Sequence, residues 1–439
     1  MIQSILIANR GEIAVRVVRA CKEMGIRSVM VYSEADKDSL AVRMADDAVC
    51  IGPAPASESY LKPKNLISAA VLKRCDAIHP GVGFLSESPG FAKAVADAGL
   101  IWIGPPAATI GMLGDKVEAK RSAIEAGVPV IPGSDGPITD VADARKQAKK
   151  MGYPVIVKAA SGGGGKGMRI VRSEDDLEGA IKIASNEAEK AFSDGTVYME
   201  KYLENPRHVE VQILADSYGN VVHLGERDCS VQFKHQKLVE ESPSTAVDEK
   251  TRAKMGKDTV SLFKSLDYVG AGTIEFLLYE GQHYFMEVNA RVQVEHPVTE
   301  LVTGIDIIRE QIKVCGGEKL SFSQDDINVS GYAVECRINA RTPGRITEYL
   351  PPGGYGVRID SFLYPGYMVS PFYDSLVAKV LTYGRDRNEG LDRMNRVLDE
   401  LVLEGITTNC EEQKRIINHP VFRSGAFGTG FLEQIEEEA

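Results

Sequence analysis

Several features that would place a chain in a membrane or outside the cell are missing from this sequence. No run of about 18 apolar residues is present to span a bilayer. The short apolar stretch Ser4–Ala8 is followed by Arg10 and Glu12 rather than by a small-residue cleavage site, so we expect no signal peptide. The seven cysteines lack CxxC spacing, which indicates no zinc or disulfide framework and favours reduced thiols in the cytoplasm.

Basic residues are also fewer than acidic residues. The 51 lysines and arginines are outnumbered by 62 aspartates and glutamates, which gives a net charge of -11. A sequence-independent nucleic-acid surface needs clustered basic residues, so this balance argues against that class. A hydrophobic content of 44% is ordinary for a soluble globular protein. Because 439 residues exceed the usual size of a single core, we expect about two to four domains.

A dinucleotide fingerprint is absent from the one place where it would be expected. Roughly the first 110 residues alternate short apolar stretches with amphipathic ones, which predicts a parallel sheet with right-handed helical crossovers. The first strand-to-helix turn, Ala8–Glu12, is not GxGxxG. The expected fold is therefore Rossmann-like without that cofactor. We expect strands at Ser4–Ala8, Ser28–Tyr32, Ala48–Ile51, Ala77–His79 and Ile101–Ile103, and a helix at Glu12–Met24.

The rest of the chain divides into segments of different character. A helical segment precedes a smaller α+β unit, and the chain then becomes rich in strands. Gly and Pro clusters at 343–354 mark a turn-rich junction near the end. We predict a Rossmann-like domain at 1–113, a helical linker at 114–130, a small domain at 131–203, a central domain at 204–330 and a C-terminal domain at 331–439.

A run of four glycines lies between two predicted strands, at Tyr153–Lys158 and Met168–Val171. Glycine backbones can curl their N–H groups around phosphate oxygens. A P-loop is excluded because Gly167, not Ser or Thr, follows Lys166, and because a strand follows rather than a helix. A flexible linker is the simplest alternative. The tight bracketing by strands favours a phosphate-covering hairpin.

Other basic and acidic residues fit a nucleotide only in combination. Lys116 and Lys158 are plausible point charges for an anionic nucleotide tail, although a lone lysine is usually just surface. The stretch Glu200–Leu203 can present backbone groups and a carboxylate to an adenine and a ribose. His208 and His235 could each touch a phosphate or a ribose, but a single histidine is more often structural.

The most informative stretch is 285–296, FMEVNARVQVEH, in which two rows alternate. On a strand with period 2, Met286, Val288, Ala290, Val292 and Val294 would pack on one face. A strand with a wet outer face is the alternative, but Glu and Asn are poor strand formers, which weakens it. We expect the polar row to hold a small substrate. That row is Glu287, Asn289, Arg291, Gln293 and Glu295.

A further carboxylate, Glu275, lies between apolar neighbours on a predicted strand, Thr273–Leu278. A buried carboxylate needs a partner. If this strand pairs with the stretch at 285–296, Glu275, Glu287 and Asn289 form an all-oxygen cluster. Oxygen ligands suit Mg²⁺ or Mn²⁺ rather than zinc.

Together these residues match a known family. The chain resembles the biotin carboxylase component of the biotin-dependent carboxylases, an ATP-grasp enzyme, from Ile5 to about residue 430. The motifs that carry the resemblance are ILIANRGEIA at 5–14, HPGVGFLSE at 79–87, the glycine run, EKYL at 200–203, HQK at 235–237, QVEHP at 293–297 and ECRINA at 335–340.

The resemblance implies a fold and a set of contacts. Residues 131–203 would be the ATP-grasp lid, 204–330 the ATP-grasp central domain with an antiparallel sheet, and 331–439 the biotin carboxylase C-terminal domain, with ATP between the lid and the strand-rich region. The nucleotide contacts would be Lys116, Lys158, Gly164, Gly165, Glu200, Lys201, Leu203, His208, Gln232 and His235. Glu275, Glu287 and Asn289 would bind Mg²⁺ or Mn²⁺, Lys237, Arg291, Gln293 and Val294 would bind bicarbonate, Glu295 would be the general base, and Arg337 would stabilise the biotin enolate.

The implied reaction is the carboxylation of biotin on a separate biotin carboxyl carrier protein, with carboxyphosphate as intermediate. The chain contains no Ala-Met-Lys-Met carrier motif and has no room for a carboxyltransferase domain. We therefore expect a cytoplasmic, free-standing subunit that works with a carrier and a carboxyltransferase subunit, and that forms the homodimer common in the family. The final acceptor, whether acetyl-CoA, propionyl-CoA or pyruvate, is left open, and so is a role in fatty acid biosynthesis.

Two other function classes remain possible from the residues alone. One is an ATP-grasp ligase that activates a different carboxylic acid. The QVE sequence at 293–295 and Arg337 favour bicarbonate and biotin instead. The other is a regulatory paralogue that binds nucleotide without turnover, against which the intact acidic residues speak. The family usually has Tyr where Val82 stands and basic residues where Phe233 stands. It also has a loop about seven residues longer after Ala340, which concerns the biotin side.

Overall fold

The computed structural model describes residues 2–134, 136–159, 168–192, 194–234 and 236–437. Gly164, Gly165 and His235 of the predicted nucleotide site lie outside these residues. The chain forms two compact units, one made of Met1–Val128 with Arg207–Ala439 and the other of Pro129–Pro206. None of the helices in the described ranges has the length and apolar character needed to cross a membrane.

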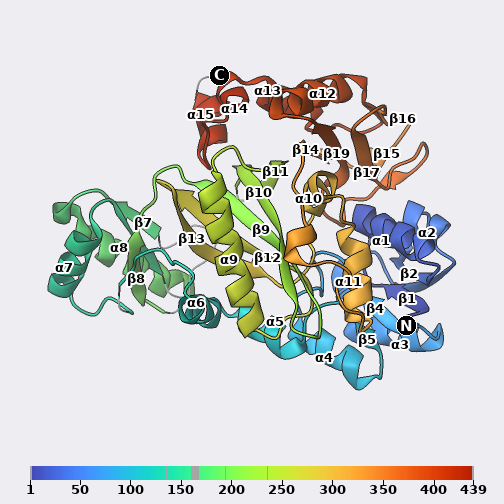
Figure 1. The fold of residues 1–439 in the computed structure, drawn as a ribbon, viewed down its shortest axis with the longest axis horizontal. Coiled ribbons are helices and arrows are strands. Elements are labelled where there is room, and N and C mark those ends of the chain that lie inside the picture. Colours follow the sequence, from blue (N-terminus) through green and yellow to red (C-terminus); the bar gives the residue numbers. More distant parts are fainter. Residues whose placement is uncertain (1, 135, 160–167, 193, 235, 438–439) are drawn as a thin grey trace. The chain divides into compact units, whose positions relative to one another are not determined.

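The larger unit begins with a five-stranded parallel sheet, which confirms the predicted Rossmann-like start (Figure 1). Its order is β3-β2-β1-β4-β5. β1 is buried throughout, and Ile13 and Val17 of α1 contribute to the core beside it, since a parallel sheet needs apolar cover on both faces. The elements are β1 Ser4–Ile7, α1 Gly11–Glu23, β2 Arg27–Ser33, α2 Leu40–Met44, β3 Asp47–Gly52, α3 Pro63–Leu72, β4 Ala77–His79, α4 Pro89–Asp97, β5 Ile101–Trp102, α5 Ala107–Gly114 and α6 Lys116–Glu125.

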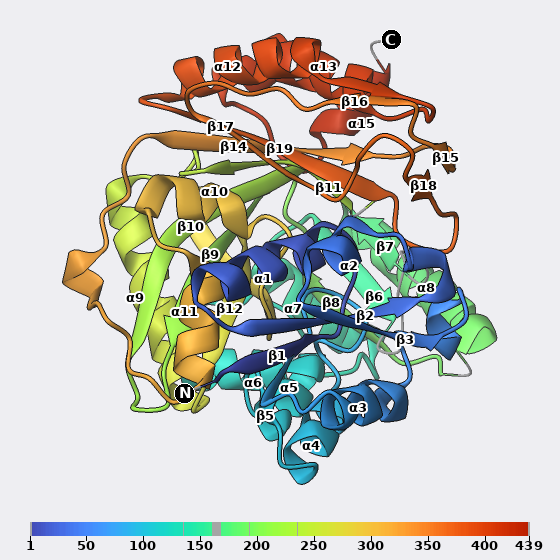
Figure 2. The same ribbon diagram turned by 90° about the vertical axis from the view of Figure 1, so that its right-hand side faces the viewer.

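An eight-stranded antiparallel sheet forms the rest of the framework, in the order β13-β12-β9-β10-β11-β14-β19-β17 (Figure 2). Helix α9 packs on β9 and β10, and α10 packs on β10, β11 and β14. The sheet joins strands from the predicted central and C-terminal domains. Its elements are β9 Arg207–Ala215, β10 Val221–Phe233, β11 Gln236–Ser242, α9 Glu249–Ser265, β12 Gly270–Tyr279, β13 Gln282–Asn289, α10 His296–Thr303, α11 Ile307–Cys315, β14 Tyr332–Asn339, β17 Val357–Ser361 and β19 Leu376–Gly384.

The polar row predicted on one strand is divided between a strand and a turn, so the prediction of a single strand face is wrong. β13 ends at Asn289, and residues 291–295 lead directly into α10, which begins at His296. Pro297 stands in the first turn of α10, where its fixed φ suits a helix and its missing N–H costs nothing. The chain must leave the sheet before this point, because α10 packs against the sheet.

The pairing on which the predicted all-oxygen cluster depends is present. β12 and β13 are antiparallel neighbours, with Glu275 opposite Glu287 and Thr273 opposite Asn289. The apolar row of β13 is less regular than its alternation predicts. Val288 is buried, but Met286 is 38% exposed.

In its described residues, the smaller unit is an antiparallel sheet, β7-β6-β8, with two helices. β6 alternates buried and partly buried positions, so one face packs against Leu177 and Ala184 of α8. This agrees with the strands predicted at Tyr153–Lys158 and Met168–Val171. The elements are α7 Val141–Met151, β6 Val155–Ala159, β7 Met168–Val171, α8 Glu174–Phe192 and β8 Val197–Lys201.

Near the end of the chain, helices cover the part of the large sheet that contains β14 and β19. α12 packs on β19 and α13 packs on α12. The short loop after Ala340 is held by hydrogen bonds from the Arg341 N–H to the Thr407 carbonyl and from the Thr407 N–H to the Thr342 hydroxyl. The elements are β15 Gly344–Arg345, β16 Glu348–Leu350, β18 Met368–Val369, α12 Arg387–Glu400, β20 Val402–Glu404, α13 Cys410–Asn418, α14 Pro420–Ser424 and α15 Phe431–Glu437.

The buried first strand provides a test of the fold. Leu6 is fully buried in β1, so Leu6→Ala should lower the apparent free energy of unfolding in urea by about 2–5 kcal/mol. Leu72, at the end of α3, is 74% exposed, and Leu72→Ala should cost less than about 0.5 kcal/mol. Equal losses for the two variants would contradict the placement of β1 at the centre of the parallel sheet.

Candidate functional site

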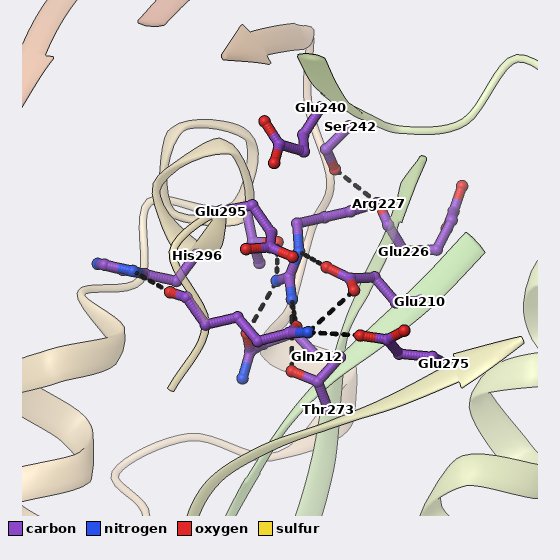
Figure 3. Close-up of polar contacts among 12 residues, drawn as sticks. Glu210, Gln212, Glu226, Arg227, Glu240, Ser242, Thr273, Glu275, Glu295 and His296 are labelled. Atoms are coloured by element: carbon purple, nitrogen blue, oxygen red, sulfur yellow. Dashed lines mark hydrogen bonds and ion pairs between the residues drawn. The ribbon is translucent and has the colours of Figure 1, made fainter. Parts of the chain in front are cut away.

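A buried arginine, Arg227 on β10, organises the centre of the large sheet. Its guanidinium is fully buried and donates to Glu210 and Gln212 of β9, its neighbouring strand, at 2.6 and 2.8 Å (Figure 3). Further hydrogen bonds reach Gln293 at 2.6 Å, and the Thr273 and Thr299 hydroxyls at 3.3 and 3.0 Å. All five N–H groups are thus satisfied. Arg227 thereby ties the sheet to the loop after β13.

A buried lysine, Lys237 on β11, lies among three carboxylates. Its ammonium donates to Glu210 at 2.7 Å, Glu275 at 3.1 Å and Glu295 at 2.6 Å. Burial alone would lower the pKa of Lys237, but Cys229 and these three carboxyl groups outweigh it and raise the pKa well above its usual value. Lys237 is therefore a permanent cation at the meeting point of β9, β11 and β12.

The predicted base, Glu295, is held between two cations. Its Oε1 accepts from Lys237, and its Oε2 accepts from Arg337 of β14 at 2.9 Å. Burial opposes ionisation of this carboxyl, but Lys237, Arg337 and Arg227 outweigh it and hold its pKa well below the usual range. Glu295 is therefore a carboxylate at neutral pH.

The three predicted metal ligands lie together on the paired strands. Asn289 donates to Glu275 Oε1 at 2.8 Å, and His208 Nε2 lies 2.8 Å from Glu275 Oε2. Burial and the charge of Glu275 raise the pKa of Glu287. Two carboxylates directly opposite each other repel, and a divalent cation held by these residues would offset that repulsion.

A pocket of about 230 Å³ opens beside this pair of strands. It is lined by Lys116 at the start of α6 and by Glu287 and Asn289 of β13. Lys116, predicted as a phosphate contact, thus shares a pocket with two of the predicted metal ligands. The pocket is of a size to take part of a nucleotide tail.

The predicted bicarbonate residues follow in the turn after β13. Arg291 donates to Glu87 at 2.8 Å and to Asn289 at 2.9 Å, and its side chain keeps partial exposure. The Gln293 amide donates to Glu210 at 3.1 Å and to Glu275 at 2.8 Å. The turn thus brings together the same groups that an extended strand would have spread along its length.

The remaining predicted nucleotide residues fall in both units. In the larger unit, the Gln232 amide lies 3.2 Å from His208 Nδ1. In the smaller unit, the Lys158 ammonium donates to Glu200 at 2.6 Å. The Lys201 ammonium donates to the carbonyls of residues 152 and 153, and Leu203 is buried.

Sequence patterns do not single out every residue of the cluster. Glu210 lies in an alternating stretch at 207–212, and Arg227 lies in a polar motif at 226–230. Charged residues within apolar strands mark both positions as candidates for a buried polar site. Lys379 of β19 is less clearly marked in the sequence, because it is a lone lysine in an apolar strand. It is fully buried, and its ammonium donates to the Val294 carbonyl at 2.8 Å and lies 3.0 Å from Glu12. Lys379 therefore fixes the loop that carries Val294.

Removal of the central guanidinium tests this network. Arg227→Met should lower the apparent free energy of unfolding by about 3–5 kcal/mol, because it leaves Glu210 buried beside one cation fewer. The measurement is urea denaturation followed by circular dichroism.

A surface arginine serves as the control for this change. Arg121 is paired with Glu118, and its side chain is 60% exposed. Arg121→Met should cost less than about 1 kcal/mol. A cost for Arg227→Met as small as that of the control would show that Arg227 does not organise the site.

Models of three domain families match the chain in succession. They are the "Biotin carboxylase, N-terminal domain" at residues 1–110, the "Carbamoyl-phosphate synthase L chain, ATP binding domain" at 115–323, and the "Biotin carboxylase C-terminal domain" at 335–434. Among curated relatives, biotin carboxylase 1 of Bacillus subtilis is 53% identical over 443 aligned positions that cover 99% of this chain and 98% of the relative. Biotin carboxylase of Pseudomonas aeruginosa is 50% identical, with 99% and 98% covered.

Solved structures agree with these relatives. A biotin carboxylase–β-γ-ATP complex from Campylobacter jejuni is 49% identical, with a TM-score of 0.90 and 99% of each chain covered. The biotin carboxylase domain dimer of Hydrogenobacter thermophilus 2-oxoglutarate carboxylase, in complex with MgADP, ADP and bicarbonate, is 44% identical, with a TM-score of 0.89 and 100% and 98% covered. Since matches of this extent span the whole chain, the chain belongs to the biotin carboxylase family.

Proposed function

We propose that the chain activates bicarbonate with ATP at the cluster around Glu295 and transfers the carboxyl group to biotin on a separate carrier protein. The observation that carries this proposal is the position of Glu295, a buried carboxylate held between Lys237 and Arg337. Lys237 can hold a bound anion, and Arg337 can stabilise an oxygen that becomes negative during the reaction. The ATP-dependent biotin carboxylase activity is that of the family to which the chain belongs.

Bicarbonate binding is the first step. Arg291, with its planar pair of N–H donors, can hold the anion in a bidentate way, while Lys237 supplies a point charge and Gln293 and the Val294 backbone complete the site. Glu295 lies within reach of Lys237 and takes the proton from bicarbonate. The Hydrogenobacter thermophilus neighbour, which is a complex with bicarbonate, supports a bicarbonate site in this fold.

Phosphoryl transfer follows. A carbonate oxygen forms a bond to the γ-phosphorus of ATP while the bond to the ADP oxygen breaks, and carboxyphosphate results. Lys116 and Lys158 are the lysines proposed to neutralise the phosphates. Glu275, Glu287 and Asn289 lie on paired strands and offer oxygen donors of the kind that would hold Mg²⁺ or Mn²⁺. When bound, that cation would neutralise charge on the phosphates.

Carboxyl transfer completes the reaction. Carboxyphosphate breaks down to CO₂ and phosphate, and the phosphate takes the N1′ proton of biotin. The resulting enolate oxygen lies, we infer, against the Arg337 guanidinium, whose charge stabilises it. The nitrogen then attacks CO₂, which forms the new N–C bond.

The partners follow from this chemistry. A biotinylated carrier protein presents the biotin, and a carboxyltransferase subunit uses the carboxybiotin that is formed. A relative from Methanothermobacter thermautotrophicus is named as one subunit of a pyruvate carboxylase, which supports a separate carrier partner. The dimeric neighbour structure supports a homodimer. The cytoplasm is the proposed location.

Substrate dependence tests the proposed function directly. The chain should release ADP from ATP only with bicarbonate and Mg²⁺ present, and free biotin should stimulate this release and become carboxylated. A coupled assay for ADP and the incorporation of ¹⁴C-bicarbonate into biotin measure the two outcomes. ADP release without any dependence on bicarbonate would point instead to another ATP-grasp ligase.

The role of Glu295 can be tested separately. Glu295→Gln should lower biotin-dependent turnover by at least about 100-fold, because the amide cannot accept the bicarbonate proton. ATP binding, measured by calorimetry, should remain nearly unchanged. Glu310→Gln, a buried carboxylate on α11 paired with Lys313, is the control and should keep normal turnover. A loss of ATP affinity in Glu295→Gln would place this residue in the nucleotide site instead.

The metal role of Glu287 has its own test. Glu287→Gln should raise the Mg²⁺ concentration needed for half-maximal ATP cleavage by at least about tenfold, because one anionic oxygen ligand is lost. Glu280 lies exposed in the turn of the same hairpin, so Glu280→Gln should leave the Mg²⁺ dependence as it is. The same Mg²⁺ dependence in both variants would remove Glu287 from the metal site.

A further inference from the structure

Two carboxyl groups that take no part in the reaction described above face each other next to Arg337. Glu240 of β11 is directly opposite Glu335 of β14, and both are fully buried. Ala333, two positions before Glu335 on the same face, packs with Val298 of α10 and with Leu381. The pair is therefore covered by an apolar layer and lies away from water.

The hydrogen bonds around this pair are incomplete. Glu240 Oε1 accepts from Arg337 Nε at 2.6 Å. Among the residues that the structure describes, Glu240 Oε2 and both carboxyl oxygens of Glu335 have no donor. The nearby cations are engaged elsewhere, since Arg337 also bonds Glu295 and Lys379 bonds the Val294 carbonyl. Buried, unpaired carboxylates are costly, and a single proton shared by the pair removes one charge and supplies a donor.

The surroundings decide which carboxyl holds the proton. Burial, with the charge of Glu240 added, raises the pKa of Glu335 well above its usual value, against the effect of Lys379. Burial raises the pKa of Glu240 to about 7, because the attraction of Arg337 offsets only part of it. The other charged or titratable groups that act on the pair are Lys237 of β11, Glu295 before α10, Cys336 of β14 and Lys379 of β19. Lys379 in turn interacts with Glu12 of α1, His296 of α10, and Arg358 and Asp360 of β17, and Arg358 interacts with Glu300 of α10.

We propose that Glu335 is a protonated carboxylic acid that donates to Glu240 Oε2, and that this proton positions Arg337 between Glu240 and Glu295. With Glu335 neutral, Arg337 is shared by two carboxylates, and one of these is the base. An ionised Glu335 would add a third negative charge beside the guanidinium and draw it away from Glu295. Glu335 is thus a positioning residue that acts through Arg337, and this role rests on the proposed function.

Infrared spectroscopy detects the proton without any need for activity. A protonated carboxylic acid has a carbonyl stretch that an ionised carboxylate lacks. Burial raises the pKa of Glu241 to about 7, so at about pD 9, roughly two units higher, Glu241 is ionised and does not contribute this band. The wild-type-minus-Glu335→Gln difference spectrum at that pD should still contain it. Glu241 neighbours Glu240 on β11 and is also buried, but its partner is Arg387, so Glu241→Gln should leave the band in place.

Kinetics then test the positioning role. The Glu335→Gln amide keeps a donor and no charge, so biotin-dependent kcat should stay within about threefold of wild type and should no longer fall at alkaline pH. Glu335→Leu has no donor and should lower biotin-dependent kcat about tenfold, a change equivalent in free energy to roughly one pKa unit. Glu241→Gln is the control and should behave as wild type. Bicarbonate-dependent ATP cleavage should fall less than carboxylation, since Arg337 acts on the biotin side.

The outcomes separate this inference from the proposed function. Absence of the band from the difference spectrum at about pD 9 would overturn the inference even if the enzyme is fully active. Unchanged pH profiles in both Glu335 variants would also overturn it. No carboxylation by the wild-type chain would instead reject the proposed function, whatever the spectrum contains. If Glu335→Leu fails to fold, the wild-type band titrated against pD and the Glu335→Gln profile still decide.

Discussion

The balance of buried charge around Lys237 is the constraint on which the site depends. Three carboxylates, Glu210, Glu275 and Glu295, converge on this one ammonium, and Arg227 neutralises Glu210 from the other side. Buried ions are tolerated only when they are paired and fully hydrogen-bonded. The antiparallel sheet satisfies that condition by bringing β9, β10, β11 and β12 side by side. Loss of either cation would leave buried carboxylates beside one cation fewer.

This arrangement also divides the chemistry by position along the sheet. Glu275 and Glu287 face each other at one edge, where a divalent cation and phosphates suit their charge. Glu295 lies towards the centre, where its cationic neighbours keep it ionised. Arg337 stands on β14 beyond it, where a developing enolate needs a positive charge. The proposed steps of the reaction thus use residues at different positions across one sheet.

Local patterns predict the edge of the site better than its centre. Period-2 alternation and a lone acidic residue between apolar neighbours identify Glu275 and Glu287 as candidates, but the pairing of their strands enters the sequence argument only as a condition. The row at 285–295 is wrong as one strand, because the packing of α10 overrides local alternation. Arg227 and Lys379 have no assigned role from sequence, since their partners come from strands and loops far along the chain. The resemblance to biotin carboxylases supplies roles that the patterns alone leave open.

The central claim is that a carbonate oxygen attacks the γ-phosphate at this cluster. The most direct measurement follows ¹⁸O from labelled bicarbonate into inorganic phosphate during biotin carboxylation, by mass spectrometry. Attack by carbonate transfers one bicarbonate oxygen to each phosphate released, so labelled phosphate is the expected result. Phosphate without label, in reactions that still produce carboxybiotin, would contradict both a carboxyphosphate intermediate and the proposed role of Glu295.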